Sequence, residues 1–230
     1  MKRAMFALWR DPNFRAIAGA AWRPGGTALT EEALSWLRSA GLLVPNGLAL
    51  DMGCGSGASL VLLASYGFSA LGFDRSYEPD ALRTLPKRAQ RVCADVRALP
   101  LRENCADLIL CECVLSLLPD PLESLTTFAR RLRTRGVCVV SDLTCEQKGG
   151  SSGGCLSGAR PRFEWQAIIS RAGFRLLYAQ DATYALRDLA ARLVWYGGTS
   201  PDHCAASCTL RHFLSRKFGY MLWIAQREDG

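Results

Sequence analysis

The sequence predicts an α/β fold built on a mostly parallel β-sheet with helices on both faces. Strand-like apolar runs alternate with helix-like segments along the chain, which is the order of βαβ units. Several of these runs are continuously apolar, as strands that are buried on both faces require. In addition, a glycine-rich turn follows the first complete strand directly, at residues 53–57.

The predicted elements follow one another in a regular order. A helix is expected to begin at Thr30, because threonine caps helices and Glu31 and Glu32 follow in the first turn. Gly41 and Pro45 then end it. Strands are predicted at residues 48–52, 69–73, 91–94, 106–111, 136–141, 174–178 and 218–225. Further helices are predicted at residues 58–65, 79–85, 121–133, 163–172 and 184–196.

A binding motif lies at the end of the first strand. Residues 51–57 read Asp-Met-Gly-Cys-Gly-Ser-Gly, so that Gly53, Gly55 and Gly57 alternate with other residues. Glycines allow the backbone to turn tightly and a ligand to lie directly against it. Asp74 ends the second strand about 20 residues after Gly53, the spacing at which a βαβ unit places a carboxylate against ribose hydroxyls. Together these features predict an adenosine-type ligand.

Composition places the chain among soluble globular proteins. Hydrophobic residues make up 49% of the 230 residues and charged residues 21%. No apolar run reaches the length that would cross a bilayer, and the apolar part of the N-terminus stops at Arg10, so we expect a cytoplasmic protein without a membrane anchor. The net charge is +7, and its one arginine cluster, at residues 130–135, is interpreted as a solvated helix end rather than a nucleic-acid patch.

The ten cysteines are expected to be thiols in a reducing compartment. Cys204 and Cys208 are four residues apart, so on a helix both thiols would lie on one face. A structural zinc would need two more ligands, for which only two nearby histidines are available. There is no compact Cys-x-x-Cys pair, and we therefore predict no metal site.

The motifs in this order resemble the class I S-adenosylmethionine-dependent methyltransferases of the methyltransferase-11 type, from about Leu48 to Ala225. Besides the glycine motif and Asp74, residues 93–96 (Cys-Ala-Asp-Val) and 107–115 (Asp-Leu-Ile-Leu-Cys-Glu-Cys-Val-Leu) match segments of that family. The resemblance implies a Rossmann-like seven-stranded sheet with an antiparallel last strand. It also implies S-adenosylmethionine as cofactor and methyl transfer as the reaction.

The resemblance assigns a role to each binding residue. Asp51 would attract the ammonium group of the methionine moiety, whose carboxylate would meet N–H groups of the glycine turn. Asp74 would accept the ribose hydroxyls, and Asp95 the adenine amine, with Val96 donating a backbone N–H. The full implied cofactor-binding set is Asp51, Gly53, Cys54, Gly55, Gly57, Asp74, Arg75, Asp95, Val96, Cys111 and Glu112.

Within the family, two segments resemble arsenite methyltransferases and similar small-molecule methyltransferases. These are residues 111–117 (Cys-Glu-Cys-Val-Leu-Ser-Leu) and residues 154–159 (Gly-Cys-Leu-Ser-Gly-Ala). Cys155 would bind a soft acceptor and is the predicted catalytic residue, with Cys204 or Cys208 assisting, since thiolates suit thiophilic centres. Glu112 departs from the pattern, because those enzymes have asparagine there, and it would bring a carboxylate near a sulfonium.

The chain is expected to form a single methyltransferase domain in three parts. They are an N-terminal helical cap at residues 1–45, a cofactor-binding half at 46–145, and a substrate-side half at 146–230 with an inserted helix and loops. A small-molecule substrate is the expected partner, and a protein partner stays open. The alternatives are methylation of RNA or of a protein, and a non-catalytic module that binds the cofactor as a partner subunit. Nucleic acid is disfavoured because the fourth strand lacks an Asn/Asp-Pro-Pro-aromatic motif.

Overall fold

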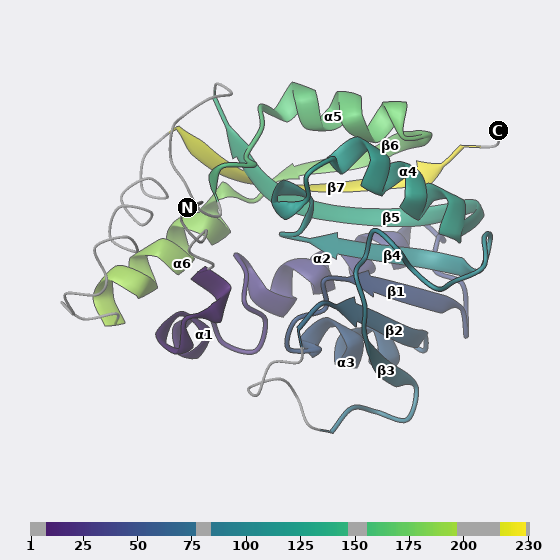
Figure 1. Cartoon of the computed structure of the whole chain (residues 1–230), viewed down its shortest axis with the longest axis horizontal. Helices are drawn as coiled ribbons and strands as arrows, with labels where there is room; N and C mark the ends of the chain where they lie inside the picture. The colour runs from purple at the N-terminus through teal and green to yellow at the C-terminus, as the bar shows by residue number, and fades with distance from the viewer. Residues whose placement is uncertain (1–7, 77–83, 147–155, 197–216, 229–230) are drawn as a thin grey trace.

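The computed structural model describes residues 8–76, 84–146, 156–196 and 217–228. In these residues seven strands form one sheet with the order β3-β2-β1-β4-β5-β7-β6 (Figure 1). The strands are β1 (Leu48–Met52), β2 (Ser69–Asp74), β3 (Ala89–Cys93), β4 (Ala106–Glu112), β5 (Leu132–Cys145), β6 (Phe174–Asp181) and β7 (Phe218–Arg227).

The sheet is parallel except at β7. Strands β1 and β2, β2 and β3, β1 and β4, and β4 and β5 pair in parallel. Strand β7 lies between β5 and β6 and runs antiparallel to both. The predicted fold class, a Rossmann-like and mostly parallel seven-stranded sheet with an antiparallel last strand, is therefore confirmed.

Helices cover both faces of the sheet. They are α1 (Pro12–Ala18), α2 (Gly26–Ser39), α3 (Ala58–Ser65), α4 (Pro121–Arg131), α5 (Arg162–Arg171) and α6 (Thr183–Tyr196), with short 3-10 turns η1 (Leu8–Arg10) and η2 (Leu115–Leu117). One core cluster joins α1, α2, α3 and α6 to the sheet, and the other joins α4 and α5 to its opposite face. Figure 1 shows α4 and α5 in front of the strands and α2 and α3 behind them.

Two helices differ from the sequence-based expectation. Helix α2 begins at Gly26 after Gly25, whose left-handed backbone (φ 75°) forms the N-cap, so Thr30 lies inside the helix and does not cap it. Its hydroxyl instead contacts a buried carboxylate, described below. Helix α1 was not predicted, although Asp11 caps it and Pro12 occupies its first position. Most of the helix predicted at residues 79–85 lies outside the described residues.

The connectivity places the ends of the first four strands at one edge. Strands β1 to β4 run in the same direction, so their carboxyl ends meet there, and such an edge is where open α/β sheets bind ligands. The chain ahead of β1 folds as η1, α1 and α2. Among the described residues, no helix is both long and apolar enough to span a bilayer.

Candidate functional site

The glycine turn between β1 and α3 depends on left-handed backbone at all three glycines. Gly53, Gly55 and Gly57 have φ values of 82°, 48° and 89°, a region that side chains with a Cβ disfavour. A Cβ at Gly53 would lie 2.4 Å from a methyl carbon of Val114, in the segment that follows β4. The turn therefore packs the end of β1 closely against the end of β4.

Several N–H groups of this turn already donate within the protein. The N–H groups of Gly53 and Cys54 donate to the Phe73 carbonyl at 2.8 and 3.0 Å, and that of Gly55 donates to Asp74 Oδ2 at 3.0 Å. These bonds fix the turn to the end of β2. They also mean that the turn serves a ligand chiefly by allowing a close approach of the backbone, and less by offering free N–H groups.

Asp51, at the end of β1, has an unsatisfied carboxylate oxygen. The residue is 3% exposed, and its Oδ2 has no hydrogen-bond partner in the structure. Burial, reinforced by the negative charge of Glu112, raises the pKa of Asp51 to about 7. A buried acceptor without a donor is costly to a protein, so Asp51 is suited to receive a cationic donor such as an ammonium group.

Asp74 and Asp95 end the two neighbouring strands at the same edge. Asp74 accepts hydrogen bonds from Gly55 and from the N–H of Ser76 at 3.1 Å. Asp95 follows β3 and pairs with Arg97 at 2.6 Å, and the hydrogen bonds from Arg97 lower the pKa of Asp95 to about 2. Asp51 and Asp74, predicted from sequence spacing, and Asp95, predicted from the family resemblance, thus lie at or just beyond the ends of three adjacent strands.

The flanking residues of this edge take different positions. Val96 is buried in the core beside α4, so only its backbone could serve a ligand. Arg75 is exposed, and its carbonyl accepts a hydrogen bond from the Cys93 thiol at 3.4 Å. The Cys54 side chain is buried against Gly72, and burial raises its pKa.

Strand β4 sends Cys111 and Glu112 to opposite faces of the sheet. The Cys111 thiol is fully buried in the core cluster beside α4 and α5, and burial raises its pKa. Only the backbone of Cys111 could therefore contact a ligand. The Glu112 carboxylate lies on the α2 and α3 side, where it accepts hydrogen bonds from Thr30 at 3.0 Å and Ser59 at 3.4 Å.

Arg23 completes the surroundings of Glu112, and sequence reasoning missed it. Its Nη2 lies 2.7 Å from Glu112 Oε2 and also donates to Thr30 and Ser59, while the buried Nε has no hydrogen-bond partner. Burial would lower the pKa of Arg23, but the charges of Glu112 and, more weakly, of Asp51 raise it above its usual value. No local signal marks Arg23, which stands in a turn-rich segment before α2.

The segment that carries Arg23 lies over the glycine turn. The hydroxyl of Ser56 donates to the carbonyl of Ala20. The Trp22 ring lies 3.6 Å from the position that a Cβ at Gly55 would occupy, which is van der Waals contact. The Arg15 guanidinium stacks on the same ring, 4.3 Å from its centre. Residues 20–23, called here the N-terminal cover, thus close one side of the site.

The segment before α5 lies against the end of β4. Leu156 is buried in the core, and a Cβ at Gly158 would lie 1.7 Å from the backbone oxygen of Ser116. Cys155, Cys204 and Cys208, the predicted acceptor-binding cysteines, lie outside the described residues. Within the described part of the chain, no group of three or more His, Cys, Asp or Glu side chains could hold a metal ion.

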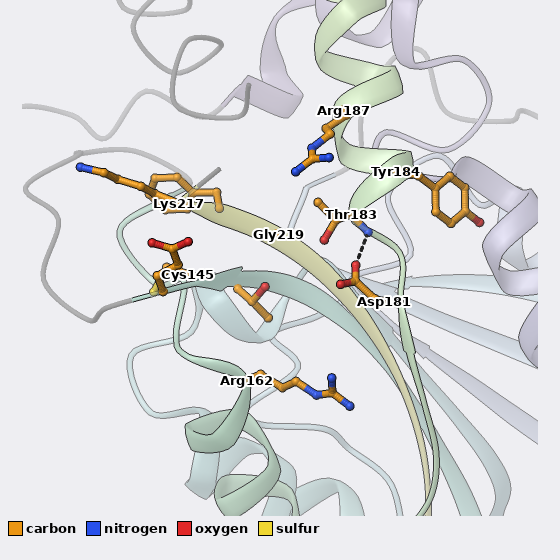
Figure 2. Close-up of a pocket in the computed structure, with 11 residues that line it drawn as sticks. Cys145, Arg162, Asp181, Thr183, Tyr184, Arg187, Lys217 and Gly219 are labelled. Carbon is orange, nitrogen blue, oxygen red and sulfur yellow. Dashed lines mark hydrogen bonds between the residues drawn. The ribbon is translucent and has the colours of Figure 1, made fainter. Parts of the chain in front are cut away.

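A separate cavity of about 490 Å³ lies at the ends of β5, β7 and β6, on the far side of β5 from β4 (Figure 2). Figure 2 shows Arg162 of α5 and Arg187 of α6 on opposite sides of the strand ends. Asp181 accepts the N–H of Thr183 at 2.9 Å, and hydrogen bonds from Thr183 lower the pKa of Asp181. The cavity is therefore polar and carries charges of both signs.

The residues at the strand edge fit S-adenosylmethionine. Asp51 offers an unpaired carboxylate oxygen for an ammonium group, and the unpaired Nε of Arg23 suits a carboxylate. The alternating glycines allow the left-handed turn beside Asp51, and Asp74 and Asp95 follow on the next two strands.

Comparison with known proteins concerns the domain and the fold. Residues 50–140 match a family model described as a methyltransferase domain. No curated protein matches the sequence. Among solved structures, the [4+2]-cyclase SpnF is 17% identical with a TM-score of 0.77, and the match covers 97% of this chain and 94% of that one.

Two ligand-bound methyltransferases are also similar in structure. A phosphoethanolamine N-methyltransferase from Haemonchus contortus, in complex with S-adenosylmethionine, is 16% identical with a TM-score of 0.73. The match covers 94% of this chain but 56% of that one, so this chain spans little more than half of that protein. Geranyl diphosphate C-methyltransferase from Streptomyces coelicolor is 15% identical with a TM-score of 0.68, covering 88% of this chain and 77% of that one.

Residues 50–140 therefore contain a segment that matches a methyltransferase domain, and the fold is one that methyltransferases solved with S-adenosylmethionine share. The methyltransferases among these neighbours act on different small molecules, according to their names. A closer relation to arsenite methyltransferases is not among these findings and remains a hypothesis.

Proposed function

We propose that this protein transfers the methyl group of S-adenosylmethionine to a small-molecule acceptor that approaches from the β4 and β5 side. The observation that carries the proposal is the unpaired, buried Asp51 carboxylate beside the glycine turn, with Asp74 and Asp95 at the ends of the next two strands. The cofactor supplies an electrophilic methyl group. The residues of the chain would supply binding and alignment, which account for much of the rate gain in such displacements.

Each residue at the edge would hold one part of the cofactor. Asp51 would bind the ammonium group and Arg23 the carboxylate of the methionine moiety. Asp74 would accept the ribose hydroxyls, with its two oxygens already oriented by Gly55 and Ser76. Asp95, held by Arg97, would accept the adenine amine, and the glycines would allow the left-handed turn that sets the backbone beside the methionine moiety.

For the acceptor, we propose a soft or already ionised nucleophile, such as trivalent arsenic or a thiol. The support is the sequence resemblance around Cys155, together with the close packing of Gly158, three residues later, on Ser116 in η2, which follows β4. A nucleophile of this kind needs no general base. The polar cavity beyond β5 offers room for the rest of a larger acceptor.

The test separates cofactor binding from transfer. Calorimetry is expected to show binding of S-adenosylmethionine to the wild-type protein, and at least a tenfold loss of affinity in Asp74→Asn, because paired ribose hydrogen bonds are lost. Glu103→Gln, an exposed carboxylate remote from the site, is the matched control and should bind normally. Absence of binding to the wild-type protein would overturn the proposal.

Transfer is then measured with labelled methyl groups and trivalent arsenic or small thiols as acceptors. Cys155→Ser is expected to lose transfer while it retains cofactor binding. Binding without transfer to any small acceptor would instead favour a role other than methyl transfer. The similarity to a protein named as a [4+2]-cyclase gives an example of such a role, because that protein has the same fold and a different reaction.

A further inference from the structure

We propose that Glu112 makes the cofactor site, here called the donor site because the cofactor donates the methyl group, bind the charged cofactor more tightly than its neutral product, S-adenosylhomocysteine. The inference rests on the proposed function and concerns the balance of charge around the site. Three charged side chains that are nearly or fully removed from solvent meet in this crevice, two acidic (Asp51 and Glu112) and one basic (Arg23). Asp74 also acts on Asp51, but it is only half-buried and accepts two backbone N–H groups. Arg23 balances one of the two buried carboxylates, so one negative charge is left for the ligand to neutralise.

The burial and contacts define this balance. The Glu112 side chain is 2% exposed and that of Arg23 12%, with their charged atoms 2.7 Å apart. Asp51 is buried close enough to both for their charges to influence its pKa. Tyr220 and Cys113 also face Arg23, and for Tyr220 burial raises the pKa well above its usual value, so the phenol stays neutral. Above pH 7, where Asp51 has lost its proton, the two carboxylates and the guanidinium give a net charge of −1.

The two ligands differ by one charge. S-adenosylmethionine carries an ammonium, a carboxylate and a sulfonium, and its net charge is +1. In methyl transfer a bond forms between the acceptor and the methyl carbon, the carbon–sulfur bond breaks, and its electron pair stays on sulfur. The product keeps the ammonium and the carboxylate but has a neutral thioether, so its net charge is zero.

Methyl transfer therefore changes the site from neutral to negative. A buried, uncompensated charge is much more costly than an exposed one, because the interior screens it poorly. The product should accordingly bind less tightly than the cofactor, which would favour its release. The hydrogen bonds around Glu112 do not themselves require a charge, because a glutamine oxygen could still accept from Arg23, Thr30 or Ser59.

Glu112→Gln tests the inference because it removes the charge and keeps the size of the side chain. Calorimetry gives the dissociation constants of S-adenosylmethionine and S-adenosylhomocysteine for both proteins. The preference of the wild-type protein for the charged ligand is expected to fall by about tenfold in the variant. Asp95→Asn is the matched control, because the adenine is common to both ligands and Asp95, which is paired with Arg97, is not among the charges that act on Asp51. It should weaken both ligands without changing their ratio.

An unchanged ratio in Glu112→Gln would overturn the inference and leave the proposed function intact. Failure of the wild-type protein to bind either ligand would overturn both. A second measurement needs no variant and covers the case in which Glu112→Gln does not fold. Sinefungin, which has an amine in place of the sulfonium, is expected to bind the wild-type protein about tenfold more tightly than S-adenosylhomocysteine; equal affinities would contradict the inference.

Discussion

At the scale of single residues, the site combines side chains that are costly for the folded protein but suited to a ligand. Asp51 has a buried oxygen with no donor, and Arg23 has a buried N–H with no acceptor. Such unsatisfied groups are rare in folded proteins and are often found at functional sites. Asp142, by contrast, is buried but has both oxygens satisfied by the N–H groups of Ser116 and Leu143. It therefore supports the backbone near the site.

The first residue-scale prediction concerns pH and cofactor affinity. The pKa of Asp51 is about 7 in the free protein, and an ammonium group binds its ionised form. Affinity for S-adenosylmethionine should therefore rise severalfold, up to about tenfold, between pH 6 and pH 7.5 as Asp51 loses its proton. Calorimetry in matched buffers measures this change. Asp51→Asn should bind weakly and show a much flatter pH profile; an equally steep profile in the variant would contradict the assignment.

The second residue-scale prediction concerns stability. The folded protein holds the Asp51 proton more tightly than the unfolded chain does, since the pKa is raised from 3.8 to about 7. Stability from this group is therefore present below about pH 4 and is lost as the pH rises through 7. At pH 8, Asp51→Asn should raise the free energy of unfolding of the ligand-free protein by about 1–2 kcal/mol.

Urea unfolding at pH 8 and at pH 4.5 measures this effect, and the gain should be smaller at the lower pH. Asp142→Asn is the informative comparison. Burial raises the pKa of Asp142 to about 6, but its oxygens accept two backbone N–H groups, so the amide substitution should give no comparable gain. Destabilisation by Asp51→Asn at pH 8 would show that the carboxylate is satisfied in the folded protein.

At the scale of elements, the segment after β4 is held from two sides. The N–H of Ser116, in η2, donates to Asp142 of β5 at 2.9 Å. The carbonyl of the same residue faces Gly158, which leaves no room for a side chain. Cys113 adopts a left-handed backbone (φ 60°) where β4 ends, and its N–H donates to Ser141. The end of β4 is thus fixed in position next to the glycine turn.

Gly158→Ala tests this contact. The added Cβ would lie 1.7 Å from the Ser116 oxygen, so the backbone must move, and we expect a loss of about 2–4 kcal/mol in the free energy of unfolding. Gly67→Ala is the control, because Gly67 has φ 89° but no atom within 4 Å of the added carbon. It should cost about 1 kcal/mol through backbone strain alone. Urea unfolding compares the two, and equal losses would refute a steric role for Gly158.

At the scale of the whole molecule, the N-terminal cover joins two distant parts of the chain. Arg23 and Glu112 are 89 positions apart in sequence, and Ser56 donates to Ala20 across 36 positions. Helix α1 also packs near α6, where the Arg192 guanidinium donates to the Ile17 carbonyl at 3.0 Å. A ligand that contacts Arg23 should therefore affect the stability of this N-terminal region.

Amide hydrogen exchange tests that link. Saturating S-adenosylmethionine is expected to slow exchange in residues 12–26 by about tenfold or more, because a ligand at 100 times its dissociation constant stabilises the bound form by about 2.7 kcal/mol. Strand β7, which pairs with β5 and β6 away from the glycine turn, provides the internal reference and should change less. Uniform protection throughout the chain, with no larger effect at residues 12–26, would indicate that the cover takes no part in binding.

The sequence by itself determined the fold class and the placement of Asp51 and Asp74 at the ends of their strands. It could do so because alternating apolar runs and short connections leave a parallel sheet few topologies, and the acids follow their strands directly. Asp51 and Asp74 needed only local spacing, and Asp95 needed the family resemblance of residues 93–96. The predicted cap at Thr30 failed for the opposite reason, because a glycine four residues earlier starts the helix and Thr30 serves a distant carboxylate.

Only the tertiary structure decided which groups surround Glu112 and which face of the sheet Cys111 occupies. Arg23, Thr30, Ser59 and Glu112 come from four separate parts of the chain, and no local pattern connects them. A buried charge must find its partner wherever packing brings one within hydrogen-bond distance. That requirement acts in three dimensions, and the charge balance of the donor site therefore became visible only in the folded molecule.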